Sequence, residues 1–561
     1  MRHLYLFSIA LLSITLFIGC GVADDASGDS NNYYNQNNVN NANNVNNGNN
    51  VNTNNSNNSN NLNNVNSTTT EPPEEFDPSN WPPETCEDNG PTTLYLSADD
   101  SNSQASPAYI SREILSGHYV NPAWVRPWEF LNYATFDYEA PDSGLALYPE
   151  LRPSSDASGL YTLQIGVRSP DRSREEMRPM NLVLVLDSSG SMAGEAIELL
   201  KESVSILFDS LGDDDRVSIV RMSAIPTVLS ENLAPLETDL DSIFTQLRPD
   251  GITNLSTALS RAYNTATAHY DASRMNRVVL FTDGAANAGE TDVDLIKAQA
   301  GVASEEGIHL MGVGLGESFN DRLLDRLTDA GKGAFIFIDS PQEAHRQFED
   351  NFVSNFDVAA LNVRVRMVLP STFSVVKFHG EEISTDPQEV TPQNLAPSDQ
   401  MIFNQLIGTC DPDATTGTES FEVSVSWTDA LERTTFDATV TFTLNSLMEA
   451  PAPNLAKGNA LVGYAETLKK LYDLRYGGHD AEITELCQAQ AALFSEAPQD
   501  EDITSGALLM SSYCNTVRQG ESHEGSCDGE PDASFAQALG LCTTEIPMEV
   551  EDLGVGTEGV R

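Results

Sequence analysis

One apolar run, and the polar residues that end it, constrain this chain most. Residues 182–186 read Leu-Val-Leu-Val-Leu, and Asp187, Ser188, Ser189, Gly190 and Ser191 follow directly. A strand that is buried on both faces of a parallel sheet is apolar throughout. Open α/β sheets bind their ligands at the loops that follow the carboxyl ends of such strands. The run therefore predicts a buried parallel strand with a ligand-binding loop at its end.

Strand and helix patterns alternate along residues 180–352. In the first predicted helix, apolar residues recur every three or four positions, which is typical of a helix that covers a sheet. Alternating strands and helices imply a mostly parallel sheet with helices on both faces. We therefore predict an α/β, Rossmann-like doubly wound domain. Its predicted strands are 182–186, 216–222, 277–281, 309–313 and 335–338, and its predicted helices are 195–211, 254–270 and 292–306.

Several side chains that offer oxygen atoms lie on loops that follow a strand or precede a helix of this domain. They are Asp187, Ser189, Ser191, Thr253 and Asp283. Carboxylate and hydroxyl oxygens suit a hard divalent cation such as Mg²⁺, which prefers oxygen ligands in octahedral geometry. This D-x-S-x-S motif, with a later threonine and aspartate, resembles the metal-ion-dependent adhesion site of von Willebrand factor A domains.

The resemblance implies a cofactor, a partner and a role for each residue. In the family, hydroxyls such as those of Ser189 and Ser191 bind the ion directly, and the aspartates act largely through water. The resemblance thus implies Mg²⁺ or Mn²⁺ with a vacant position, which an Asp or Glu side chain of a partner protein fills. The expected function is binding rather than turnover. Ile252 departs from the family pattern, which often has glycine before the threonine.

Other interpretations of these residues stay open. Asp, Ser and Gly favour turns, so residues 187–191 alone could form a turn that needs no metal. Ser191 could instead be a nucleophile, which requires an adjacent base, usually histidine. No histidine lies near Ser191 in the sequence, although His309 and His345 could approach it in the fold. We expect no catalytic residues and no enzymatic activity.

The chain is strongly acidic, with 83 acidic and 30 basic residues and a formal net charge of −53. Such a surface repels nucleic acids and anionic membrane faces. It also concentrates cations near the protein, which favours occupancy of a weak metal site. We expect no nucleic acid among its partners, and no small-molecule substrate.

The N-terminus has the pattern of a bacterial export signal. A basic start precedes an apolar stretch over residues 4–18. That stretch is shorter than the ~20 residues of a membrane-spanning helix, and it predicts a signal peptide over residues 1–19. Residues 17–20, Phe-Ile-Gly-Cys, resemble a lipobox, which implies lipidation of Cys20. We expect a lipid-anchored protein of the bacterial cell envelope, and the residues after Cys20 favour the outer over the inner membrane.

Residues 20–90 are expected to form a disordered tether between this anchor and the folded part of the chain. Residues 31–66 are rich in asparagine and carry too little apolar surface to offset the entropy of ordering. About 50 flexible residues have a root-mean-square reach of roughly 40 Å. The tether would therefore hold the folded part away from a membrane.

Family-specific modules are expected before the α/β domain. Residues 91–150 resemble the module that precedes the A domain in a family of bacterial envelope proteins. Within it, Arg126 and Glu129 are spaced to pair on one face of a helix. Residues 151–179 are expected to supply a strand and a linker.

The sequence after the α/β domain changes its periodicity. Residues 353–447 contain segments in which apolar and polar residues alternate, which predicts an antiparallel β-sandwich. The earlier strand Leu160–Val167 could join this sandwich. Residues 448–543 predict a small helical module that contains cysteines, and residues 544–561 predict an acidic tail.

Six cysteines remain when Cys20 is set aside as the lipid carrier. Exported chains meet oxidising conditions, so up to three disulfides are expected, and the sequence does not choose among their pairings. The six are Cys86, Cys410, Cys487, Cys514, Cys527 and Cys542.

Together these features predict an envelope lipoprotein that captures an acidic side chain of a partner at a Mg²⁺ or Mn²⁺ site. Two alternatives remain open. The protein could be a structural or assembly component of the envelope whose metal site is filled by its own chain. It could also be an accessory subunit of a larger complex.

Overall fold

The computed structural model describes residues 78–83, 90–99, 101, 103–252, 254–284, 293–305, 307–315, 323–324, 327–328, 331 and 333–519. The predicted signal peptide, the lipidation site Cys20, most of the tether and the acidic tail lie outside the described residues. Four other residues named above also lie outside them, namely Thr253, Cys86, Cys527 and Cys542.

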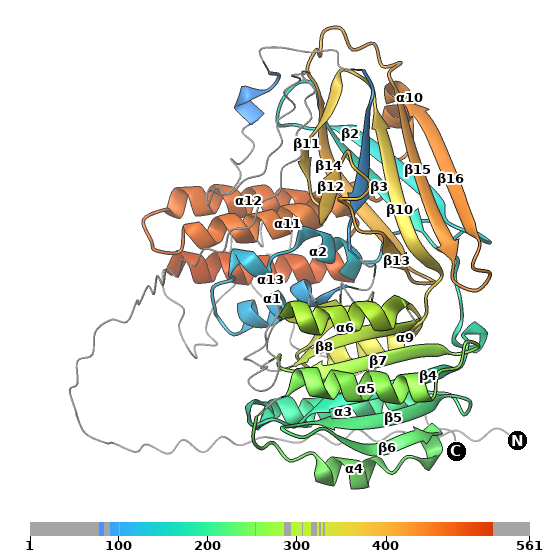
Figure 1. Ribbon diagram of the computed structural model, residues 1–561. Coiled ribbons are helices and arrows are strands. Elements are labelled where there is room, and N and C mark those ends of the chain that lie inside the picture. The colour runs from blue at the N-terminus through green and yellow to red at the C-terminus, as the bar shows by residue number, and fades with distance from the viewer. Residues whose placement is uncertain are drawn as a thin grey trace, which may run out of the picture. The chain divides into compact units, whose positions relative to one another are not determined.

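A six-stranded sheet forms the centre of the α/β domain (Figure 1). Its strand order is β6-β5-β4-β7-β8-β9, and all neighbouring strands are parallel except β5 and β6. The arrangement confirms the predicted doubly wound α/β fold. The strands are β4 (Met180–Asp187), β5 (Arg216–Met222), β6 (Thr227–Leu233), β7 (Met275–Thr282), β8 (Ile308–Leu315) and β9 (Phe335–Ile338).

Alternation along β4 gives the sheet a separate core on each face. All residues of β4 are buried. Its leucines belong to one apolar cluster and its valines to another, because successive side chains of a strand point to opposite faces. Helices complete both cores. Helices α3 (Glu195–Asp209) and α8 (Pro341–His345) cover the leucine face, and α5 (Leu255–Ala268) and α6 (Val293–Glu305) cover the valine face.

The edge of this domain contains two elements that the sequence patterns do not predict, strand β6 and helix α4 (Leu240–Gln246). Most residues of β6 are exposed or half-buried, so the strand lacks the continuous apolar run that identifies β4 and β7. After α8 the domain ends in a π-helical turn, η6 (Arg346–Asp350), and a short helix, α9 (Phe352–Phe356).

Two antiparallel sheets pack face to face beside the α/β domain and share one apolar core. The first has the order β12-β1-β10-β15-β16, with β13 also paired to β10, and the second has the order β11-β14-β3-β2. Their strands are β1 (Thr92–Ser97), β2 (Ala146–Pro153), β3 (Leu160–Arg168), β10 (Ala360–Leu369), β11 (Phe373–Phe378), β12 (Glu382–Ser384), β13 (Gln393–Leu395), β14 (Gln400–Thr409), β15 (Ser420–Asp429) and β16 (Thr435–Thr443).

The strand predicted at Leu160–Val167 does join the sandwich, as β3, and pairs with β14 from Leu160 to Arg168. Strands β1 and β2 join it as well, although β1 lies within the segment 91–150 that the sequence suggests as a separate module, and β2 begins there. The sandwich therefore draws strands from both sides of the α/β domain. The division of the chain into independently folding domains remains a prediction.

A helical layer contains the N-terminal helices α1 (Ala105–Leu115) and α2 (Pro127–Tyr133) and the C-terminal helices α11 (Leu455–Asp473), α12 (Asp480–Glu496) and α13 (Glu501–Gln519). These helices share one apolar core. Arg126 and Glu129 form the predicted ion pair, which is buried. Helix α10 (Leu444–Glu449) leads from the sandwich into this layer. Short 3₁₀ helices occur at Pro78–Asn80, Pro122–Trp124, Arg174–Glu176, Gly190–Met192 and Pro235–Glu237.

Two contacts fasten the C-terminal helices. A disulfide joins Cys487 of α12 to Cys514 of α13, which confirms one of the expected bridges, and Cys410 is also disulfide-bonded. Gly458 lets α11 approach β3, because a Cβ at this position would lie 1.8 Å from the Oε1 atom of Gln164. Among the described helices, none is both long and apolar enough to span a bilayer.

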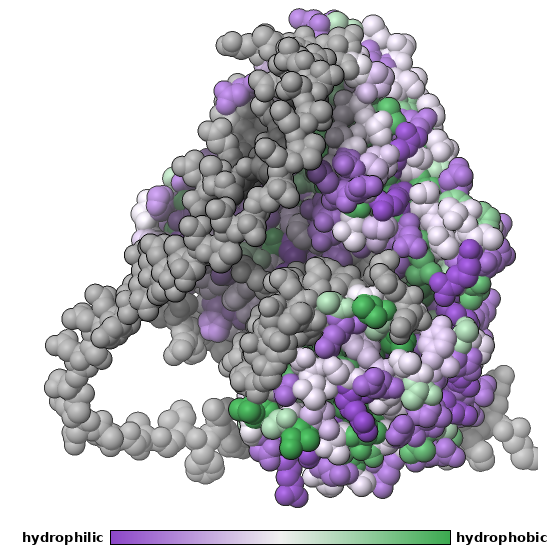
Figure 2. All heavy atoms as spheres, viewed as in Figure 1, coloured by the Kyte–Doolittle hydropathy of each residue, from purple (hydrophilic) through white to green (hydrophobic). Residues whose placement is uncertain are grey.

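The visible face of the described part is mostly hydrophilic or intermediate in hydropathy (Figure 2). Some large apolar side chains are exposed, among them Ile225, Leu236 and Ile252. Exposed apolar side chains are common in folded proteins, so these residues by themselves identify no binding region.

Candidate metal centre

The carboxyl ends of β4 and β7 meet where the winding of the sheet reverses. The chain passes from β4 to β5 on one side of the sheet, and later returns to β7 on the other side of β4. Doubly wound sheets bind ligands in the crevice at such a point. Asp187 is the last residue of β4, and Asp283 directly follows β7. The topology thus places two of the predicted residues at the expected ligand-binding edge.

Backbone hydrogen bonds hold the loop after β4 against two neighbouring segments. Ser188 donates to the carbonyl of Met222 through both its N–H and its hydroxyl, at 3.0 and 3.1 Å. Asp250 donates its N–H to the carbonyl of Ser188 at 3.0 Å, and Gly190 donates its N–H to that of Gly251 at 3.2 Å. These bonds fix the loop relative to the end of β5 and to the segment that leads into α5.

The carboxylate of Asp187 is buried and accepts hydrogen bonds from neutral groups. The N–H of Ser189 donates to Oδ1 at 2.9 Å, and the hydroxyl of Thr282 donates to Oδ2 at 2.6 Å. Burial raises the pKa of Asp187 to about 6, and these two donors and the nearby charge of Asp283 modify it less. A cation near this carboxylate would favour its charged form and lower that pKa.

The hydroxyl oxygens of Ser189 and Ser191 lie 3.0 Å apart. Ser189 is buried, whereas Ser191 is exposed, so one hydroxyl of the pair lies in the interior and the other at the surface. Mg²⁺ holds oxygen ligands at about 2.0–2.1 Å in octahedral geometry, and two adjacent ligands of such an octahedron are about 2.9 Å apart. The spacing of the two hydroxyls therefore fits neighbouring positions around one Mg²⁺ ion.

The predicted site residues can now be placed one by one. Hydrogen bonds join Asp187, Ser189 and Ser191, and Asp283 follows the strand that pairs with β4. Thr253 lies outside the described residues. Its neighbour Asn254 caps α5 by accepting a hydrogen bond from the N–H of Thr257. Metal binding by any of these residues remains a prediction.

One residue of this centre, Thr282, was not predicted from the sequence. Its hydroxyl donates to Asp187 and accepts from the N–H of Gly284 at 2.9 Å. A polar residue that ends an otherwise apolar strand, directly before Asp283, was the available signal. In the described residues, no group of three or more His, Cys, Asp and Glu side chains is arranged to hold a metal. The candidate centre depends instead on hydroxyl oxygens together with carboxylates.

His309 and His345 are the two histidines that the sequence leaves open as a base for Ser191, and the structure places His309 away from it. His309 is in register with Arg277, which is in register with Leu182. Leu182 precedes Asp187 by five residues, which corresponds to roughly 16 Å along a strand. His345 is exposed on α8 and lies 2.8 Å from Glu349. The register thus places His309 too far along the sheet to serve Ser191 as a base.

Comparison with known proteins supports the fold. The family model described as the von Willebrand factor type A domain matches residues 181–351. This segment is therefore a von Willebrand factor A domain, called the A domain below. Domains of this type commonly bind a divalent metal and mediate protein–protein interactions.

Two relatives align with this chain over more residues than this segment contains, but over only part of either protein. The uncharacterized protein YfbK of Escherichia coli (strain K12) is 28% identical over 278 residues, which cover 47% of this chain and 48% of YfbK. The inter-alpha-trypsin inhibitor heavy chain H3 of Mesocricetus auratus is 24% identical over 235 residues, covering 40% of this chain and 26% of that protein. The chain thus aligns with about half or less of either relative.

Among solved structures, a von Willebrand factor type A protein from Catenulispora acidiphila is similar. It has 15% sequence identity and a TM-score of 0.41, and the match covers 64% of this chain and 87% of that structure.

Proposed function

We propose that the A domain binds Mg²⁺ or Mn²⁺ at the ends of β4 and β7, and that the bound ion captures an Asp or Glu side chain of a partner protein. Ser189 and Ser191 would hold the ion directly. Asp187, Asp283 and Thr253 would complete the set of oxygen donors. The observation that carries this proposal is the 3.0 Å separation of the Ser189 and Ser191 hydroxyls beside the buried carboxylate of Asp187.

The donor chemistry favours a hard cation. The side chains involved offer only oxygen atoms, and Mg²⁺ and Mn²⁺ prefer oxygen ligands over sulfur. The described partners of Asp187 are an N–H and a hydroxyl, so they leave the buried negative charge without a compensating positive one. A divalent ion in the crevice would supply that compensation.

The expected partner chemistry follows from the exposed end of the hydroxyl pair. Neutral hydroxyls neutralise little of the charge of a divalent ion, so an ion held by them attracts a further anionic ligand. Ser191 is exposed, which leaves one side of the site accessible from outside. A carboxylate on a partner protein can therefore approach an ion there. The protein has a formal net charge of −53, so the remainder of its surface would repel an acidic partner. A bound metal ion would therefore direct such a partner to the A-domain site.

The cellular setting is part of the same proposal. The lipobox-like Cys20 and the asparagine-rich tether favour a lipid-anchored protein of the bacterial cell envelope, with the outer membrane favoured over the inner. A lipid anchor at Cys20 would concentrate the A domain near a membrane, and the tether would let it search for partners.

Titration calorimetry of Mg²⁺ and Mn²⁺ into the purified chain tests the site. We expect saturable binding that is lost in Asp187→Ala and in the Ser189→Ala, Ser191→Ala double variant. Ser205→Ala is the matched control, because Ser205 lies on α3, its hydroxyl donates to the Lys201 carbonyl and it is not a proposed ligand; it should retain binding. Absence of binding by the unaltered chain would contradict the proposal.

A second experiment tests the partner. Envelope proteins from a bacterium that encodes the chain would be captured on it in Mn²⁺, and then eluted with chelator. Partners that elute with chelator, and that the double serine variant does not capture, would support metal-dependent binding. Capture that neither chelator nor the variant affects would show that the metal has no part in it.

A further inference from the structure

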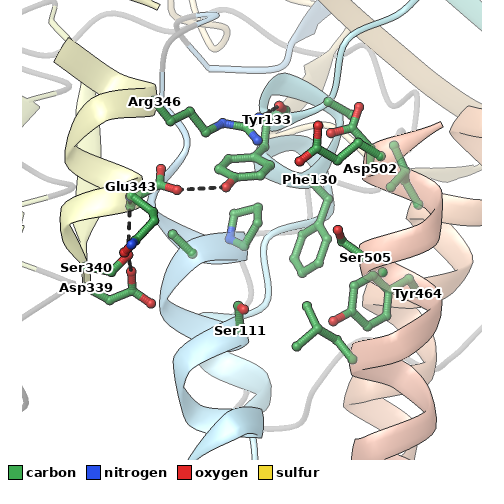
Figure 3. Close-up of a pocket in the computed structure, with 18 of the residues that line it drawn as sticks. Ser111, Phe130, Tyr133, Asp339, Ser340, Glu343, Arg346, Tyr464, Asp502 and Ser505 are labelled. Atoms are coloured by element: carbon green, nitrogen blue, oxygen red, sulfur yellow. Dashed lines mark hydrogen bonds between the residues drawn. The ribbon is translucent and has the colours of Figure 1, made fainter. Parts of the chain in front are cut away.

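A cavity that contains none of the proposed metal ligands lies where the A domain meets the helical layer. Its volume is about 540 Å³, and its walls come from α1 and α2, from α8 of the A domain, and from α11 and α13 (Figure 3). Cavities of about 300–1,000 Å³ are typical of small-molecule sites. The cavity is therefore large enough for a small organic ligand.

One side of the cavity is aromatic and aliphatic. Phe130 and Tyr464 meet edge to face, with ring centroids 5.3 Å apart, and both line the cavity. Leu115, which also lines it, is 72% exposed. Figure 3 shows the Phe130 and Tyr464 rings directed toward the space between the helices. This side can cover the apolar body of a ligand and can also interact with a cation through the ring faces.

Acidic residues also line the cavity, both on the A-domain side and on α13. Among the described residues that line it, carboxylates outnumber basic groups five to one. The carboxylates are Asp339, Glu343, Asp350, Glu501 and Asp502, and the basic residue is Arg346. Asp502 is already paired, because the ammonium group of Lys457 lies 2.7 Å from it. The remaining four carboxylates still outnumber the single guanidinium group of Arg346.

The charge of Arg346 is engaged within the wall. Its guanidinium lies 3.7 Å from the centroid of the Tyr133 ring and donates to the Tyr133 carbonyl at 2.7 Å. Tyr133 in turn donates its hydroxyl to Glu343 at 3.0 Å, as Figure 3 shows. This arrangement orders the wall and holds the positive group against an aromatic face.

Glu343 is the most deeply placed of these carboxylates, with 8% of its surface exposed. It accepts from the neutral groups of Tyr133 and Gln347, the latter at 2.6 Å. Burial raises the pKa of Glu343, because the cost of desolvation outweighs these hydrogen bonds and the nearby charge of Arg346. A positively charged ligand in the cavity would favour the charged form of this carboxylate.

We propose that this cavity binds an organic cation in which an ammonium or guanidinium group is joined to an apolar or aromatic body. The acidic wall would attract the charged group, and Phe130, Tyr464 and the neighbouring leucines would cover the body. Such a ligand would touch the A domain and both sets of helices. It could be a free amine or the side chain of a lysine or arginine in a peptide, because both present the same chemistry.

The test uses three probes of similar shape and different charge: benzylamine, benzyl alcohol and benzoate. Calorimetry on the full chain at about 0.15 M ionic strength limits nonspecific attraction of cations to the acidic surface. We expect benzylamine to bind with a Kd of about 1 mM or lower, and the other two at least about tenfold more weakly. Equal binding of all three, or no binding of benzylamine, would overturn the proposal.

Two double variants distinguish binding in this cavity from nonspecific attraction of a cation to the acidic surface. Asp350→Asn with Glu501→Gln removes two exposed carboxylates from the cavity rim, and should weaken benzylamine binding about fivefold, as expected for two exposed charge interactions. Asp241→Asn with Glu202→Gln removes two exposed carboxylates elsewhere on the A domain and should leave binding unchanged. An equal loss in both double variants would contradict a specific site.

A Gly-Lys-Gly peptide identifies the source of the cation. Tighter binding of the peptide than of benzylamine would support a lysine side chain of a peptide as the natural occupant. Weaker binding of the peptide would support a free amine. Neither experiment involves the metal centre, so chelator should not change the result.

Discussion

Thr282, the last residue of β7, donates its hydroxyl at 2.6 Å to the carboxylate of Asp187, the last residue of β4. The bond crosses the point where the winding of the sheet reverses, and it joins the two strands whose ends hold the proposed metal site. Groups that orient metal ligands in this way influence metal affinity without touching the ion.

Replacing Thr282 should therefore weaken metal binding. Thr282→Val keeps the shape of the side chain and removes the donor to Asp187, and we expect a roughly tenfold to hundredfold loss of Mg²⁺ affinity. Thr282→Ser keeps the hydroxyl and should bind nearly as well as the unaltered chain. Calorimetric titration of Mg²⁺ measures both; equal affinity of the valine and serine variants would show that the hydroxyl does not position Asp187.

Asp187→Asn should change stability in opposite directions with and without metal. Burial raises the pKa of Asp187 to about 6, so the charged carboxylate costs folding free energy at neutral pH when no cation is present. In chelator, we expect the asparagine variant to be more stable by on the order of 2 kcal/mol. On addition of Mg²⁺ only the unaltered chain should gain stability.

Thermal unfolding with chelator and with saturating Mg²⁺ measures this effect. Asparagine can still accept from the N–H of Ser189 through Oδ1, while its amide faces the Thr282 hydroxyl. A variant that is less stable than the unaltered chain in chelator would show that the hydrogen bonds of the carboxylate outweigh the cost of its burial.

Lys457 should contribute strongly to the stability of the helical layer. Its side chain is 3% exposed, and its ammonium group donates to the Thr135 carbonyl at 2.7 Å and lies 2.5 and 2.7 Å from Asp500 and Asp502. Lys457→Met removes this charge and leaves two carboxylates facing each other, so we expect a loss of about 3 kcal/mol. Urea unfolding measures it.

Lys201→Met is the matched control for that experiment. Lys201 pairs with Glu198 at 2.7 Å, but the Glu198 side chain is 71% exposed. Exposed pairs contribute little, so the control should lose less than about 1 kcal/mol. Similar losses in the two variants would mean that burial does not distinguish the two pairs.

His379 should make the protein less stable in mild acid. Burial lowers its pKa to about 4, Lys377 and Lys469 lower it further, and Glu466 on α11 opposes them. The unfolded chain binds a proton at this histidine below pH 6.5 while the folded chain does not, so stability should fall as the pH decreases from about 6.5 to 4. The contribution is at most about 3 kcal/mol.

Urea unfolding at pH 7 and pH 4.5, on the unaltered chain and on His379→Asn, isolates this contribution. Burial raises the pKa of Asp399 to about 7, so this carboxyl group makes the folded protein more stable as the pH falls over part of the same pH range. This effect is common to both proteins. Only the difference in stability loss between the unaltered chain and the variant is therefore informative. The unaltered chain should lose more stability than the variant between the two pH values. Equal losses would contradict the prediction.

Local patterns predict the A domain well. The strands predicted at 216–222 and 335–338 coincide with β5 and β9, and the helix predicted at 195–211 corresponds to α3, which ends at Asp209. Buried parallel strands and amphipathic helices each carry their own periodicity, so their sequences reveal them without knowledge of their neighbours. Strand β6 carries no such pattern, because most of its residues are exposed or half-buried, and it was missed.

The oxygen donors after β4 and β7 could be named in advance because topology alone brings the carboxyl ends of adjacent parallel strands together. Thr282 could not be assigned, because its role depends on the rotamer and on the 2.6 Å approach to Asp187. The membership of β1 in the sandwich was likewise hidden. Its partner β10 follows about 260 residues later in the chain, and pairing over that separation leaves no local signal.

The sequence by itself thus determined the doubly wound A domain, the edge of its sheet where ligand binding is proposed, and the oxygen chemistry expected there. Only the tertiary structure decided that the flanking segments share one sandwich and one helical core, and that an acidic, aromatic cavity forms where they meet the A domain. Periodicity records the burial of each element along its own length. A cavity instead depends on side chains from five helices, and on the distances that packing leaves between them.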